Sequence, residues 1–107
     1  MATAPKSEVL HMADLASYQE GSVVSRQITK DDAGNVTLFA FDEAQELSEH
    51  TAPFDALVHV LDGKVEVRIS GKSYFLETGD AIIMPADEPH ALKAITKFKM
   101  LLTMIRK

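Results

Sequence analysis

Four histidines are the side chains with the widest chemical scope in this sequence, because the chain contains no cysteine. Without cysteine there are no disulfides, thiolate nucleophiles or cysteine-based zinc sites, so any metal needs His, Asp, Glu or water as ligands. Near pH 7 a neutral imidazole donates a hydrogen bond from one nitrogen and accepts at the other, so a pair can hold a polar ligand or transfer a proton. His50 and His90 are the candidate pair. His59 alternates with valines and is expected on an outer or dimer-forming face, and nothing near His11 suggests chemistry.

No other reactive arrangement accompanies these histidines. The sequence lacks a Gly-x-Ser-x-Gly elbow, a glycine-rich phosphate loop and a dinucleotide-binding fingerprint. Gly71 and Gly79 are expected in turns. The histidines therefore remain the side chains on which a functional hypothesis depends.

The elements that must position the histidines are predicted to be strands. Residues 64–70 alternate, with Val65, Val67 and Ile69 on one face and polar residues on the other, which is typical of a half-buried strand. Asp62-Gly63 before this segment predicts a hairpin turn. The same reasoning predicts strands at 22–30, 36–41, 47–50, 55–62, 64–70, 73–77, 81–84, 90–95 and 98–106. We therefore expect an all-β fold, a small antiparallel β-barrel or jelly roll.

Length and composition limit the architecture and the partners. A chain of 107 residues fits one domain, and we expect an N-terminal arm at 1–20, with a helical turn near Asp14, and a barrel domain at 21–107. The net charge of −5 comes without a block of Lys or Arg, so nucleic acid is not an expected partner. No apolar run approaches the roughly 20 residues of a membrane span, and the N-terminus lacks the apolar core of a signal peptide. We expect a cytoplasmic protein.

Three predicted strands are apolar on both faces, which requires a cover for the second face. They lie at 57–61, 81–84 and 100–105. Exposed apolar surface of this kind usually marks a partner, and a symmetric dimer is the commonest arrangement. We expect a homodimer. The alternative is that the N-terminal arm covers these faces.

Two stretches resemble the sequence motifs of the cupin superfamily. Within 44–63, His50 matches the first histidine and Gly63 the turn glycine of the first motif. Within 79–90, Gly79, Pro85 and His90 match the second motif. The resemblance implies a barrel open at one end, with His50 and His90 approaching one another across its interior. A one-residue slip of either strand would turn its histidine outward.

The departures from the motifs concern the metal ligands. Cupin metal sites use three histidines and one glutamate, and this chain has Ala52 in place of a histidine and Ala56 in place of the glutamate. Ala44 and Ala94 replace a glycine and an asparagine. Asp55 lies beside the missing glutamate but has the opposite parity. The resemblance therefore implies at most a weakly bound divalent metal at His50 and His90.

Three functional hypotheses follow. The first is a small-molecule-binding barrel that uses His50 and His90 without tightly held metal. The second is a metal-dependent enzyme of the dioxygenase, isomerase or decarboxylase type. The third is a structural or interaction barrel in which both imidazoles are satisfied by backbone or water. The missing ligands at Ala52 and Ala56 count against the second.

Overall fold

Tight turns divide the chain into short antiparallel strands. Gly63 and Gly71 both have φ of +84°, in the left-handed region that glycine adopts without a steric penalty. The computed structural model describes residues 3–106, which hold a 3₁₀ turn, η1 (Met12–Asp14), and nine strands. The strands are β1 (Val23–Asp31), β2 (Gly34–Phe41), β3 (Glu46–His50), β4 (Phe54–Asp62), β5 (Lys64–Ile69), β6 (Lys72–Glu77), β7 (Ala81–Met84), β8 (His90–Ala94) and β9 (Phe98–Arg106). Within 3–106, no helix is long and apolar enough to cross a membrane.

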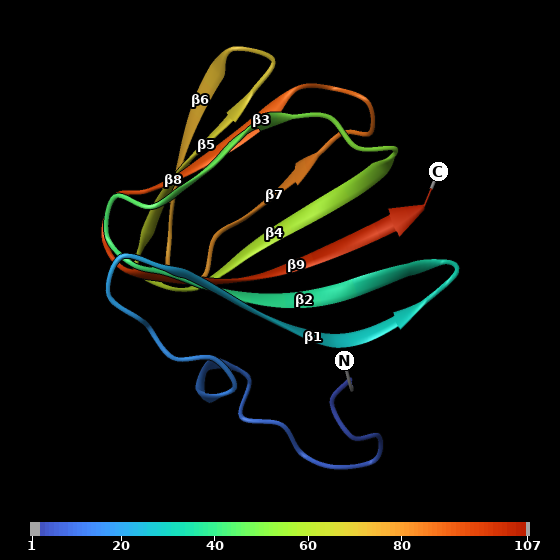
Figure 1. Cartoon of the computed structure of the whole chain (residues 1–107). Coiled ribbons are helices and arrows are strands. Elements are labelled where there is room, and N and C mark those ends of the chain that lie inside the picture. Colours follow the sequence, from blue (N-terminus) through green and yellow to red (C-terminus); the bar gives the residue numbers. More distant parts are fainter. Residues whose placement is uncertain (1–2, 107) are drawn as a thin grey trace.

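The strands form two antiparallel sheets that face each other (Figure 1). The five-stranded sheet has the order β1-β2-β9-β4-β7, and the four-stranded sheet has the order β3-β8-β5-β6. Consecutive strands β3 and β4 lie in different sheets, and the chain crosses between them at Pro53, where proline would interrupt pairing. The predicted all-β jelly roll is confirmed.

The core lies between the two sheets. Val65 and Val67 of β5 are fully buried, and Ile69 packs against them, as their alternation predicts. From the other sheet, β4 contributes Val58 and Val60, both with no exposed surface. The two inner faces therefore meet as a continuous apolar layer, and polar residues of these strands face outward.

The N-terminal arm covers part of the outer face of the five-stranded sheet. Figure 1 shows this segment, in blue, outside β1 and β2. The Ala4 N–H donates to the Ile28 carbonyl at 2.8 Å, and the arm residues Ala4 and Ala16 are buried with Leu38 and Ala40. Half-buried Leu101 packs against the same cluster. The arm therefore covers part of one of the apolar strand faces, that of the segment 100–105, for which the sequence analysis predicted a cover.

The rest of that outer face stays exposed. Leu57 is 37% exposed, Ile83 61% and Ile105 59%, and these residues lie on the adjacent strands β4, β7 and β9. Leu57 stands directly opposite Ile83 in the sheet. An apolar patch therefore remains outside the area that the arm covers.

Candidate functional site

A bulge in β3 brings His50 opposite His90. Leu47 pairs with Leu92 and His50 pairs with His90, so two residues of β3 fall opposite the single residue Ala91. With regular pairing from Leu47, Glu49 would face His90 and His50 would lie beyond it. The bulge therefore decides which side chain of β3 meets His90.

The two imidazoles are in direct contact. Their Nε2 atoms lie 3.1 Å apart, and the rings are nearly perpendicular, with centroids 4.3 Å apart. The sequence predicted that they would approach across the barrel interior. They are instead neighbours on adjacent strands of one sheet, which is why the contact is so short.

Backbone carbonyls fix the outer nitrogen of each ring. His50 Nδ1 lies 2.7 Å from the Ser48 carbonyl oxygen, and His90 Nδ1 lies 3.1 Å from the Glu88 carbonyl oxygen. A carbonyl accepts only, so both Nδ1 atoms must donate. Both Nε2 atoms are then left to face each other. A hydrogen bond in each of the three contacts, the two Nδ1 contacts with carbonyls and the Nε2···Nε2 contact, requires three N–H protons. Two neutral rings carry only two.

The pair is therefore complete when it holds one extra proton, shared along the Nε2···Nε2 line. His90 is buried, with 4% of its surface exposed, whereas His50 is exposed. Burial, and then the charge of His50, lower the pKa of His90, while its bond to the Glu88 carbonyl acts in the opposite direction. The arrangement favours the neutral form of His90, whose Nε2 can then accept a hydrogen bond.

The surroundings do not complete a metal site. Ala56 is buried and stands opposite Met84 and Met104, so methyl and thioether groups occupy the place where the cupin pattern has a carboxylate. Asp55 Oδ1 accepts from the Ala86 N–H at 2.9 Å, on the outward parity that the sequence predicted. Among residues 3–106, no group of three or more His, Cys, Asp or Glu is placed to hold a metal ion. Two imidazoles do not fit a catalytic site, which normally has three protein ligands.

His59 and His11 lie away from this pair. His59 lies on the outer face of the five-stranded sheet, opposite Ala81 and Leu101. His11 is exposed in the arm, directly before η1. Neither side chain joins the site.

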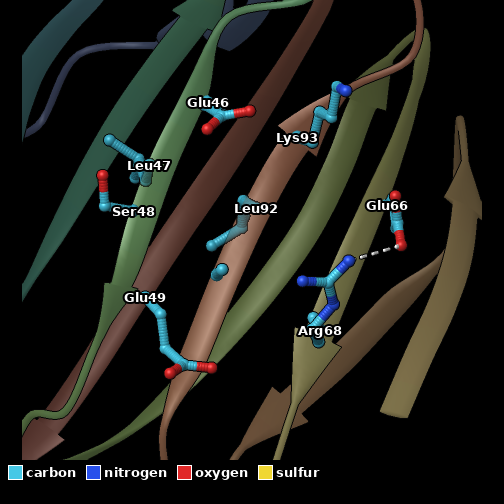
Figure 2. A pocket seen from close by; sticks show the side chains of 9 residues that line it. Glu46, Leu47, Ser48, Glu49, Glu66, Arg68, Leu92 and Lys93 are labelled. Carbon is cyan, nitrogen blue, oxygen red and sulfur yellow. Dashed lines mark ion pairs between the residues drawn. The ribbon is translucent and has the colours of Figure 1, made fainter. Parts of the chain in front are cut away.

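A shallow hollow lies on the outer face of the four-stranded sheet, behind the histidines. Its volume is about 240 Å³, and neither His50 nor His90 lines it. Figure 2 shows Glu49 of β3, Lys93 of β8 and Arg68 of β5 around it, with an Arg68–Glu66 ion pair of 3.6 Å. The Arg68 side chain is 52% exposed and that of Glu66 22%, so solvent weakens this ion pair and it contributes little.

A second hollow, of about 470 Å³, lies where the end strands β6 and β7 of the two sheets face each other. Ile69, Tyr74 and Ile82 give it an apolar wall, and Lys72 and Glu88 are its charged residues. The sequence analysis did not identify it, because its lining comes from three strands and from the two segments that connect β5 to β6 and β7 to β8. The one available signal was the parity of Lys72, which shares the inner face with Tyr74.

Comparisons with known proteins agree with this architecture. The model of a family described as "Cupin domain" matches residues 37–106. A conserved protein of unknown function from Streptococcus pyogenes is 31% identical, with a TM-score of 0.92 over 100% of this chain and 96% of that one. A cupin superfamily protein from Desulfitobacterium hafniense is 25% identical, with a TM-score of 0.91 over 99% and 97% of the two chains. A cupin 2 conserved barrel domain protein from Leptotrichia buccalis is 35% identical, with a TM-score of 0.88 over 91% of this chain and 47% of that one. No curated protein matches the chain.

Proposed function

The chain belongs to the cupin family, and from that premise we propose that it binds a small polar molecule at the paired imidazoles of His50 and His90. The observation that carries the proposal is the 3.1 Å contact between the two Nε2 atoms, with both Nδ1 atoms held by carbonyls. Two rings fixed in this way present two polar atoms at one point. Small-molecule sites typically have few polar groups of this kind within apolar walls.

The proton count makes the proposal specific. An anion that replaces the Nε2···Nε2 contact needs an N–H from each ring, so its binding takes up protons and strengthens as pH falls. A divalent cation needs both Nε2 lone pairs, so its binding releases protons and strengthens as pH rises. The sign of the pH dependence therefore identifies which kind of ligand occupies the pair.

The test is a thermal-melting and calorimetric titration of the purified protein with two probes, sodium acetate and zinc chloride, each at several pH values. The variants are His50→Ala and His90→Ala, and His11→Ala is the matched control because it removes a histidine outside the site. We expect at least one probe to stabilise the wild type and the control, and neither site variant. If the site variants keep the metal content and every melting shift of the wild type, the proposal fails.

The two other hypotheses become outcomes of the same test. A metal-dependent enzyme would require zinc, or another divalent ion, to bind at one equivalent in spite of the two-nitrogen donor set. A structural barrel would give no binding that depends on either histidine. The fixed orientation of both Nε2 atoms favours the binding function over the structural one, because satisfaction of the Nδ1 atoms alone would not require the rings to meet.

A further inference from the structure

We infer that the ligand of the histidine pair is elongated and lies along the inner face of the four-stranded sheet, with one polar end at His50 and His90 and an anionic end at Lys72. This inference rests on the proposed function and names the chemical class of its ligand. The class is an amphipathic small molecule with a carboxylate or similar anion at one end and a second polar group at the other.

The strand register places these residues in one row. His50 pairs with His90, His90 pairs with Ile69, and Ile69 pairs with Lys72. Directly opposite residues of antiparallel neighbours share a face of the sheet. The row therefore crosses all four strands from β3 to β6, with imidazoles at one end, an ammonium at the other and an isoleucine between them.

The Lys72 ammonium is held on this face. Its Nζ lies 5.2 Å from the centre of the Tyr74 ring, a cation–π distance. Tyr74 stands opposite the fully buried Val67 and packs against the core. A lysine that pointed outward from β6 would not contact this ring.

The apolar hollow lies at the Lys72 end of the row, and neither His50 nor His90 lines it. Its volume of about 470 Å³ falls within the roughly 300–1,000 Å³ typical of small-molecule sites. Ile69 belongs both to the row and to the wall of the hollow, and Tyr74 and Ile82 continue that wall. An aliphatic or aromatic ligand body therefore has an apolar surface to cover beside Lys72, and Ile69 continues that surface toward His90.

The charges favour an anion at the Lys72 end. The one carboxylate that lines the hollow, Glu88, already accepts a hydrogen bond from the Ser70 hydroxyl at 2.7 Å. The backbone carbonyl of the same Glu88 accepts from His90 Nδ1, so the loop before β8 links the two ends of the row. Lys72 is the remaining charged group in the lining, and its natural partner is an anion.

The strand spacing sets the length of the ligand. Neighbouring strands lie about 4.8 Å apart, so the backbones of β8 and β6 are separated by about 9.6 Å. Linear dicarboxylates are suitable probes because their length changes while their end groups stay constant. We expect suberate to bind about tenfold more tightly than succinate, which is too short to reach both ends.

The experiment is calorimetric titration of the full chain at one pH and ionic strength with succinate, adipate, suberate and the monocarboxylate octanoate. We expect Lys72→Gln to remove the preference of the wild type for suberate over octanoate. Lys64→Gln, an exposed lysine on the opposite face, is the matched control and should keep that preference. Glu88→Gln should strengthen suberate binding, because it removes the competing negative charge and keeps an oxygen that can accept from Ser70.

Two results would overturn the inference. If Lys72→Gln and Lys64→Gln both keep the suberate preference, the anionic end does not lie at Lys72. If affinity is independent of chain length, or no dicarboxylate binds, the elongated ligand is wrong. The proposed function is decided separately by the loss of acetate or zinc binding in His50→Ala and His90→Ala, so either failure can be recognised without the other.

Discussion

Replacement of Gly63 by alanine tests the corner at which the chain passes from β4 in the five-stranded sheet to β5 in the four-stranded sheet. The sequence predicted a hairpin at Asp62-Gly63, but β4 and β5 do not pair with each other. A Cβ at this position would lie 2.0 Å from the Lys97 carbonyl oxygen and 2.8 Å from Phe98 Cβ. It would also sit on a backbone with φ of +84°. Phe98 is fully buried and stacks on Phe41 with ring centres 4.5 Å apart, so the neighbour that must move is part of the core.

Two other glycines separate these two effects. Gly71 has the same φ of +84° with nothing within 4 Å of the added Cβ, so Gly71→Ala measures backbone strain alone, about 1–2 kcal/mol. Gly34 lies outside the left-handed region, but its Cβ would lie 2.0 Å from the Met104 carbonyl oxygen. Gly34→Ala therefore measures the displacement of a neighbouring strand, about 1–3 kcal/mol. Gly63→Ala combines both, and we expect a loss of about 2–5 kcal/mol in the free energy of unfolding.

Urea unfolding at pH 7 measures all three variants against the wild type, with the midpoints compared at equal m-value. Alanine also stabilises each variant by restricting the conformations of the unfolded chain. This contribution is common to the three variants and cancels when their free energies of unfolding are compared. We expect Gly63→Ala to lose more stability than either Gly71→Ala or Gly34→Ala. A Gly63→Ala protein no less stable than Gly71→Ala would refute the close approach of the Lys97 carbonyl to this turn.

Three further predictions concern the histidines and the exposed patch. Because the pKa of His90 is lowered in the folded protein, the unfolded state binds its proton more readily, and the free energy of unfolding should fall as pH drops below about 6.5. His90→Asn should reduce this pH dependence. Urea melts in which the variant keeps the pH dependence of the wild type would contradict the prediction. Protein purified without an affinity tag should carry well below one equivalent of divalent metal by mass spectrometry, and a full equivalent that survives dialysis would contradict the two-ligand donor set. We expect light scattering to give about twice the chain mass of 11.7 kDa, because a second copy would cover the exposed Leu57 and Ile83. Ile83→Lys should move the protein toward the monomer, and a wild-type monomer would contradict the homodimer.

The sequence predicted the strands well because alternation and turn residues act locally. The segments at 81–84 and 98–106 match β7 and β9 at both ends. The second strand was predicted to start at Val36 and starts at Gly34, because Gly34 and Asn35 pair with Ile105 and Met104. That pairing depends on a distant strand, so turn-forming residues became part of the sheet. The helical turn expected near Asp14 is the short η1.

The site was less predictable from the sequence because it depends on which residues of neighbouring strands pair with each other. The motifs identified His50 and His90, and the structure brings both together. Simple alternation from Leu47 would instead turn Glu49 toward the inner face and His50 outward. Only the bulge between Leu47 and His50 reverses this, and no turn residue in the sequence marks it. The row that ends at Lys72 likewise follows from three pairings that no local pattern contains.

The bulge also makes the chemistry of the site easy for evolution to change. Leu47 opposite Leu92 is the last regular pair before the bulge. Regular pairing of the same residues beyond Leu47 would place Glu49 opposite His90 and would replace a pair of bases with an acid and a base, whereas deletion of one of the two residues opposite Ala91 would keep His50 opposite His90. A single backbone irregularity therefore decides which of two site chemistries this strand presents to His90.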